Sequence, residues 1–97
     1  MNISILLPYK ENFSPEYPGA VSLFVYETTK ISKFKKDITV YGNTSFKKRF
    51  DLKYKNIELK KRSFSSQTKN YVKKFTDLEK KNGSTIIEIH NRPSYIQ

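Results

Sequence analysis

The chain has 97 residues but no cysteine and no tryptophan, and it contains only three glycines and one histidine. Without cysteine it can form neither a disulfide nor a thiolate metal site. A single histidine cannot build a metal site alone. The Walker loop G-x-x-x-x-G-K-[ST] and the dinucleotide motif G-x-G-x-x-G are also absent. Disulfides and thiolate metal sites are therefore excluded, and nucleotide binding cannot be claimed from a loop motif alone.

Long apolar runs are missing too. The first run, Ile3 to Leu7, is short, has no basic residue before it and is closed by Pro8, unlike a signal peptide. No segment approaches the roughly 20 apolar residues of a membrane span. The 36% of hydrophobic residues lie in periodic clusters, which favours one folded domain over disorder. We therefore expect a cytoplasmic protein.

Acidic residues are scarce, and the formal net charge is +10. The excess lies in residues 31–81, where sixteen Lys and Arg oppose five Asp and Glu. Lysine dominates, and Arg49, Arg62 and Arg92 are the three arginines. Specific recognition of bases or phosphates favours the planar fork of arginine. The pattern therefore favours a solvated surface, while binding of nucleic acid or anionic lipid stays open.

Short apolar runs bounded by turn residues predict four strands, which lie in the stretches NISILLP, DITVYG, NIELK and TIIEI. A first helix is expected from Ala20 to about Lys33; its apolar positions are Val21, Phe24, Val25, Thr28 and Ile31. A second helix is expected within SFSSQTKNYVKKFTDLEKKNG, capped by Ser65 or Ser66 and stopped at Gly83. Its apolar stripe is Tyr71, Val72, Phe75 and Leu78.

Strands that alternate with helices and are apolar on both faces indicate α/β architecture, with right-handed parallel βαβ units. We predict a Rossmann-like parallel sheet of order 3-2-1-4 with helices on opposite or shared faces. The residues expected at its centre are Ile3, Ile5, Leu6, Val40, Ile87 and Ile89. Four strands and two helices leave such a sheet short of cover, so the chain resembles the first half of a doubly wound domain.

Ligands of open parallel sheets bind outside the carboxyl ends of the strands. Gly19 opens the first helix, where free N–H groups favour phosphate, although a glycine can also serve only the turn. His90, Asn91 and Arg92 follow the fourth strand. In the alternative interpretation, His90 is a structural histidine whose hydrogen bonds are satisfied within the fold. Asn91 and Arg92 are then a helix cap and a surface residue before Pro93. No Ser/His/Asp arrangement and no paired carboxylates are evident.

The stretches SILLPYKENFSPEYPGAVSLFVYET and IIEIHNRPSYIQ resemble the N-terminal half-domain of family 4 glycosyltransferases, retaining enzymes of the GT-B fold. The hexapeptide E-I-H-N-R-P is the more specific part. Many members carry two glycines where this chain has Pro18-Gly19. The resemblance implies that residues 1–97 form part of the N-terminal, acceptor-side domain. The C-terminal nucleotide-sugar-binding domain is absent from this chain.

By this resemblance, Gly19 and Ala20 would lie beside the phosphates and sugar of the donor or beside the acceptor. His90 would be the catalytic residue, contacting a hydroxyl of the transferred sugar, and Asn91 and Arg92 would join it in substrate binding. No metal and no bound cofactor are implied, because the nucleotide sugar is a substrate. The implied reaction moves a sugar with retention to a glycan or lipid-linked acceptor, in cell-surface polysaccharide or glycolipid synthesis. The chain alone would be inactive.

Two other functions stay open. One is a small basic nucleic-acid-binding module, although no RNP-like, KH or zinc motif is present. The other is an α/β interaction domain without a ligand. A lipid-linked acceptor would also bring peripheral contact with the anionic inner face of the membrane. For that contact, the basic stretch FKKRFDLKYKNIELKKR would supply Phe46, Phe50 and Tyr54 as apolar anchors, unless these rings pack beneath their loop.

Overall fold

The computed structural model describes residues 1–59 and 67–90. Its elements are β1 (Ile3–Leu6), α1 (Ala20–Lys30), the 3-10 helix η1 (Lys35–Asp37), β2 (Ile38–Gly42), β3 (Tyr54–Asn56), α2 (Gln67–Asn82) and β4 (Ile86–Ile89). The four strands form one sheet of order β3-β2-β1-β4, and all three strand pairs are parallel. The predicted α/β class and strand order are confirmed.

The third strand lies earlier in the chain than the predicted stretch NIELK. It pairs with β2 from Tyr54, opposite Val40, to Asn56, opposite Gly42. Because β2 ends at Gly42, the residues that follow Asn56 have no further residue of β2 to pair with. The backbone N–H of Ile57 donates a last bond to the carbonyl of Gly42 at 2.7 Å, and its side chain turns into the core.

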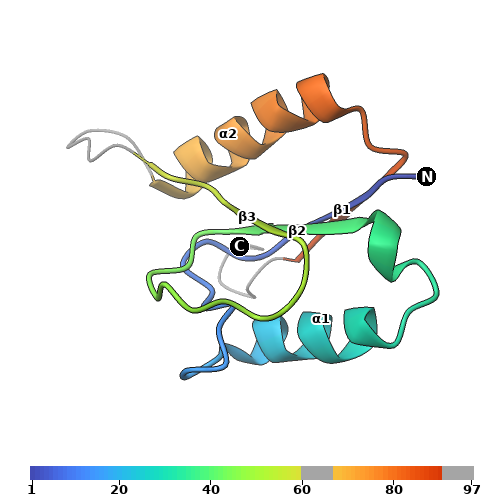
Figure 1. Ribbon diagram of the computed structural model, residues 1–97. Coiled ribbons are helices and arrows are strands. Elements are labelled where there is room, and N and C mark those ends of the chain that lie inside the picture. The colour runs from blue at the N-terminus through green and yellow to red at the C-terminus, as the bar shows by residue number, and fades with distance from the viewer. Residues whose placement is uncertain (60–66, 91–97) are drawn as a thin grey trace.

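The two helices cover opposite faces of the sheet, and Figure 1 shows α2 on one side and α1 on the other. Each face has its own apolar cluster. On the α1 face the buried residues are Ile5, Leu7, Phe13, Val25, Ile38 and Val40. On the α2 face they are Leu6, Tyr41, Ile57, Tyr71 and Phe75. Successive residues of β1 and β2 alternate between these clusters, as the pleat requires.

The buried side of α1 differs from the predicted stripe. Its buried residues are Ser22, Val25 and Thr29, whereas Phe24 and Ile31 are 59% and 80% exposed. The helix is therefore rotated so that two small hydroxyl residues face the sheet beside Val25. Ile31 lies after the last helical residue, so helical spacing no longer sets its direction.

In α2 the predicted stripe is confirmed at Tyr71 and Phe75, which are 1% and 3% exposed. The Tyr71 hydroxyl donates to the carbonyl of Leu7 at 2.6 Å, and the Phe75 ring meets the Tyr41 ring edge-on at 5.2 Å. Val72 is 42% exposed, so that part of the stripe was wrong. Position 72 lies one residue after Tyr71 and hence about 100° around the helix.

The end of α2 agrees with the prediction and adds a buried carboxylate. Gly83 has φ +63°, and its N–H donates to the carbonyl of Glu79 at 2.8 Å, which ends the helix. The Glu79 side chain is buried and accepts a hydrogen bond from the Ser4 hydroxyl at 2.5 Å. The predicted caps Ser65 and Ser66 lie outside the described residues.

The burial predicted for the fourth strand was wrong. Ile86, Ile87 and Ile89 are 46%, 48% and 52% exposed. Strand β4 pairs only with β1 and forms one edge of the described sheet, so neither of its faces is covered as the central strands are. Its β-branched composition correctly predicted a strand, but whether the isoleucine side chains are buried depends on which elements pack against that strand.

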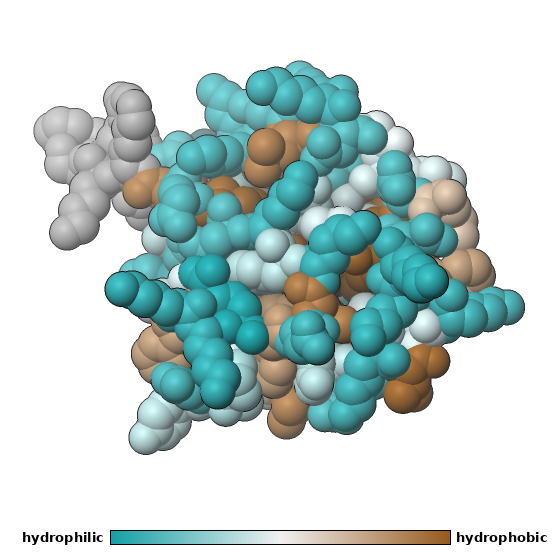
Figure 2. Space-filling model, viewed as in Figure 1, coloured by the Kyte–Doolittle hydropathy of each residue, from teal (hydrophilic) through white to brown (hydrophobic). Residues whose placement is uncertain are grey.

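Two of the three proposed membrane anchors pack inward. The Phe50 ring stacks on Tyr26 with centroids 4.1 Å apart, and Tyr54 stacks on Phe13 at 5.2 Å. These rings pack beneath the loop after β2 and cannot insert into a lipid surface in this structure. No helix in the described part of the chain is long and apolar enough to cross a membrane. On the face that Figure 2 shows, hydrophilic side chains predominate and hydrophobic atoms form small separate patches.

Candidate functional site

Parallel pairing brings the carboxyl ends of the four strands to one edge of the sheet, where such folds bind ligands. The described segments that leave this edge are residues 7–19 after β1, residues 43–53 after β2, residues 57–59 after β3, and His90 after β4. They contain Gly19 and His90 of the candidate residues that the sequence suggested, together with a polar network that it did not.

Gly19 is the residue before the first turn of α1, and Ala20 begins the helix. Gly19 has extended backbone angles, φ −69° and ψ 158°, which any residue can adopt. Its N–H donates to the carbonyl of Asn12 at 3.2 Å, and its own carbonyl accepts from Leu23. Having no side chain, it cannot cap the helix, and the cap comes from elsewhere.

Glu11 supplies this cap. Its carboxylate is 5% exposed, and Oε2 accepts a hydrogen bond from the backbone N–H of Ser22 at 3.0 Å. A Cβ atom added to Gly19 would lie 1.6 Å from that same oxygen. The close approach that the sequence predicted beside Gly19 is thus made by a carboxylate of the same chain. A negative charge at a helix N-terminus is favourable, because the helix dipole and free N–H groups attract it.

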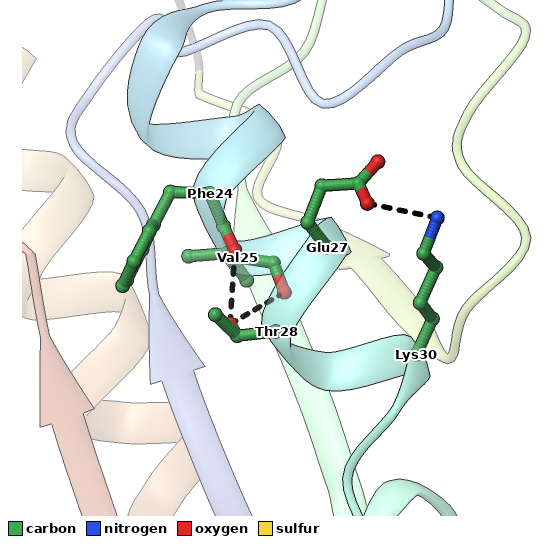
Figure 3. A network of polar contacts seen from close by, with 5 residues as sticks. All are labelled: Phe24, Val25, Glu27, Thr28 and Lys30. Atoms are coloured by element: carbon green, nitrogen blue, oxygen red, sulfur yellow. Dashed lines mark hydrogen bonds and ion pairs between the residues drawn. The ribbon is translucent and has the colours of Figure 1, made fainter.

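His90 lies against the helix that starts at Ala20, although seventy residues separate the two. Its backbone N–H donates to the carbonyl of Leu6 at 2.9 Å, which fixes it to the carboxyl end of β1. Its ring centroid is 6.5 Å from that of Phe24, one helical turn after Ala20. Figure 3 shows Phe24 on the side of α1 that faces β1 and β4, away from the Glu27–Lys30 ion pair.

The side chain of His90 is 22% exposed, and its Nε2 lies 3.0 Å from Oε1 of Glu88. A carboxylate in this position orients the ring and fixes which nitrogen can carry the proton. An oriented imidazole at the rim of the sheet can exchange hydrogen bonds with a hydroxyl of a ligand. Asn91 and Arg92, the other predicted site residues, lie outside the described residues.

A second polar group ties the loops after β1 and β2 to strand β3, with Thr44 at its centre. The Thr44 hydroxyl lies 2.7 Å from that of Tyr54 and accepts from the N–H of Phe13 at 3.1 Å. Its oxygen also lies 3.4 Å from the carbonyl oxygen of Glu11. Asn56 Oδ1 accepts from the Tyr54 hydroxyl and from the Thr44 N–H, each at 2.8 Å. These contacts hold three segments in one arrangement.

Arg49 extends this group with a positive charge. Its Nη2 donates to the carbonyl of Thr44 at 3.1 Å, and its guanidinium carbon lies 5.4 Å from the centroid of the Tyr54 ring. Burial raises the pKa of Tyr54 above its ordinary value of 10.0, while the Thr44 hydrogen bond and the charge of Arg49 act in the opposite direction. The arginine and the tyrosine therefore share one partly buried site.

Sequence reasoning missed Glu11, Thr44 and Arg49 as members of this edge. A glycine before the first turn of a helix provides no capping oxygen, so the acidic residue eight positions earlier was an available signal for Glu11. Thr44 carries no comparable signal, because its partners are far away in sequence. Arg49 was counted with the exposed lysines beside it.

The described residues contain no group of three or more His, Cys, Asp or Glu side chains that could hold a metal ion. Comparison of the chain with models of known protein families gave no match. Comparisons with curated proteins and with solved structures also gave none. The function must therefore be argued from the residues and their geometry.

Proposed function

We propose that the chain is the N-terminal part of a retaining GT-B glycosyltransferase of family 4. It would serve the acceptor side of an enzyme that moves a sugar from a nucleotide sugar to a glycan or lipid-linked acceptor. The observation that carries the proposal is the position of His90. Its backbone is held at the carboxyl end of β1, and its ring lies 6.5 Å from that of Phe24, one turn after the start of α1, which supports the role that the resemblance implies for it.

The buried carboxylate of Glu11 refines the roles within this proposal. A diphosphate placed beside Gly19 would meet a like charge, which is unfavourable in a partly buried site. A sugar hydroxyl could instead donate a hydrogen bond there. We therefore assign sugar hydroxyls to the Gly19 and His90 side, and the diphosphate to the second domain that the family resemblance implies.

Sequencing the DNA downstream of codon 97 tests the proposal most directly. The expected result is a continuing frame that encodes a second α/β domain, with a lysine and a Glu-x7-Glu pattern. The 97-residue chain alone should show no sugar transfer and no saturable micromolar binding of a nucleotide sugar. Tight donor binding by this chain would contradict the division of roles between the domains.

His90→Ala separates a role in the reaction from a role in folding. The backbone bond from residue 90 to Leu6 survives the substitution. The lost contact with Glu88, whose side chain is 54% exposed, contributes at most about 1 kcal/mol. We expect the free energy of unfolding to change by less than about 1 kcal/mol, while transfer by the full-length enzyme falls strongly. Unchanged turnover would remove His90 from the site.

Contact with an anionic membrane is part of the proposal, and the structure reduces the residues that can supply it. Lys47 and Lys48 are exposed, and the half-buried Phe46 ring lies 6.3 Å from that of Tyr17, which is 87% exposed. This small aromatic and basic surface replaces the three anchors expected from the sequence. If the chain instead binds nucleic acid with steep salt dependence and a sequence preference, the alternative module is favoured.

A further inference from the structure

Arg49 differs from the lysines beside it in how the fold holds it. Lys47 and Lys48 are exposed, whereas Arg49 is half-buried. Its guanidinium is fixed between the carbonyl of Thr44 and the face of the Tyr54 ring. A long side chain held in this way has already lost much of its rotational freedom, so a ligand that binds it would restrict little more.

This guanidinium forms no ion pair within the described part of the chain. The ion pair between lysine or arginine and a carboxylate found there is Lys30 with Glu27. Its Nε is buried without an acceptor, and the hydrogen bond found for its five N–H groups is the one from Nη2 to Thr44. A partly buried charge is costly unless it is paired, and the outer N–H groups of this guanidinium remain available to a partner from outside the chain.

The position of Arg49 suggests what would complete it. It lies in the loop that follows β2, and this loop starts at the same carboxyl edge of the sheet as Gly19 and His90. Through Thr44 it is connected to the loop after β1, since Thr44 bonds to the backbone of Glu11 and Phe13. A planar guanidinium matches the oxygens of a carboxylate or a phosphate, and it is the usual protein group for binding them.

We propose that Arg49 binds an oxyanion group, a phosphate or a carboxylate, carried by the acceptor. The acceptor assignment rests on the proposed function, but binding of the oxyanion does not. The oxyanion would meet the outer N–H groups of the guanidinium while Nη2 keeps its bond to Thr44. The Tyr54 ring, over which the guanidinium lies, helps to keep the guanidinium in place.

Nuclear magnetic resonance of the Nε–H groups of arginine tests this in the 97-residue chain. Its three arginines give three resonances, and Arg49→Lys identifies the one from Arg49. Inorganic phosphate is titrated at constant ionic strength, followed by glucuronate in a separate series. The Arg49 resonance should shift saturably in at least one series, with a dissociation constant on the order of 1 mM. A response to phosphate alone indicates a phosphorylated acceptor, and a response to glucuronate alone indicates a uronic acid.

Two variants separate the fork from simple charge. Arg49→Lys keeps the charge but loses the bidentate geometry, so affinity should fall about tenfold or more when followed by backbone resonances of the loop. Lys48→Gln removes one exposed charge and should leave affinity within about twofold. Non-saturating shifts of all three arginines, or undiminished binding in Arg49→Lys, would overturn the proposal.

The outcome at Arg49 can be distinguished from the outcome for the proposed transferase function. Saturable binding at Arg49 without a transferase domain downstream would keep the oxyanion site and remove its assignment to an acceptor. A downstream transferase domain without any response of Arg49 would keep the enzyme class and remove this site.

Discussion

Gly19→Ala tests the most specific contact in the structure, the approach of the Glu11 carboxylate to the start of α1. The new Cβ atom would lie 1.6 Å from Oε2 and 2.3 Å from Cδ of Glu11, so the carboxylate must move. Moving it breaks the bond to the Ser22 N–H. The backbone angles of residue 19 suit alanine, so backbone strain adds nothing.

The expected magnitude follows from these terms. A hydrogen bond to a charged group contributes about 1.5–3 kcal/mol, and the charge at the helix terminus adds up to about 1–2 kcal/mol. Replacing glycine stabilises by about 0.4–1 kcal/mol through the unfolded chain. Gly19→Ala should therefore destabilise by about 0.5–4.5 kcal/mol, measured by urea unfolding followed by circular dichroism.

A double-mutant cycle isolates the contact. In a Glu11→Ala background the Cβ atom meets no carboxylate, so Gly19→Ala should become neutral or slightly stabilising. Because the effect of replacing glycine on the unfolded chain cancels in the cycle, the coupling free energy should be about 1.5–5 kcal/mol. An equal cost of Gly19→Ala in both backgrounds would refute the idea that glycine is needed there to admit Glu11. Any other contact of the Glu11 carboxylate that the Cβ atom displaces is included in this coupling free energy.

Phe75→Ala should destabilise by about 3–5 kcal/mol in urea unfolding, whereas the exposed Val72→Ala should stay within about 0.5 kcal/mol; similar costs would mean that α2 is rotated differently. The raised pKa of Tyr54 means that the folded state holds its proton more tightly, so stability falls as the pH rises above about 10. A ring-carbon titration of Tyr54 with its midpoint at or below 10.0 would contradict this. Replacing Lys47 and Lys48 by glutamine should weaken sedimentation with anionic vesicles at low salt by about 2 kcal/mol, roughly thirtyfold, whereas equal binding to neutral vesicles would rule out an electrostatic membrane contact.

Strand order could be predicted from the sequence because it depends on features that the chain carries locally. β-branched runs define the strands. Helix α1 between β1 and β2, and helix α2 between β3 and β4, are the crossover connections that parallel strands use, whereas a loop alone joins β2 and β3. The end of α2 was equally local, since Gly83 adopts a left-handed backbone conformation there. Such signals need no knowledge of what lies on the other side of the sheet.

Burial was less predictable because it depends on neighbours. In α1 the valine, phenylalanine and threonine residues define two overlapping stripes of similar apolarity, and the structure buries the stripe containing Ser22 and Thr29. In β4 the isoleucines are as apolar as those of β1, yet only one side of the strand is paired. Composition cannot distinguish a central strand from an edge strand when both read as continuous apolar runs.

The carboxyl edge joins an acidic and a basic residue through one threonine. The Thr44 hydroxyl lies 3.4 Å from the carbonyl oxygen of Glu11, whose carboxylate caps α1, and the Thr44 carbonyl accepts a hydrogen bond from Arg49. On our proposals, this fixes the polarity of the acceptor site. Groups of the acceptor that lie near α1 must be neutral hydroxyls, because a second negative charge would face Glu11. The negative group must lie on the side of the loop after β2, where Arg49 has N–H donors that make no hydrogen bond within the described residues. An acceptor carrying its charge at the opposite end would therefore be bound the wrong way round, so the two loops together select its direction as well as its chemistry.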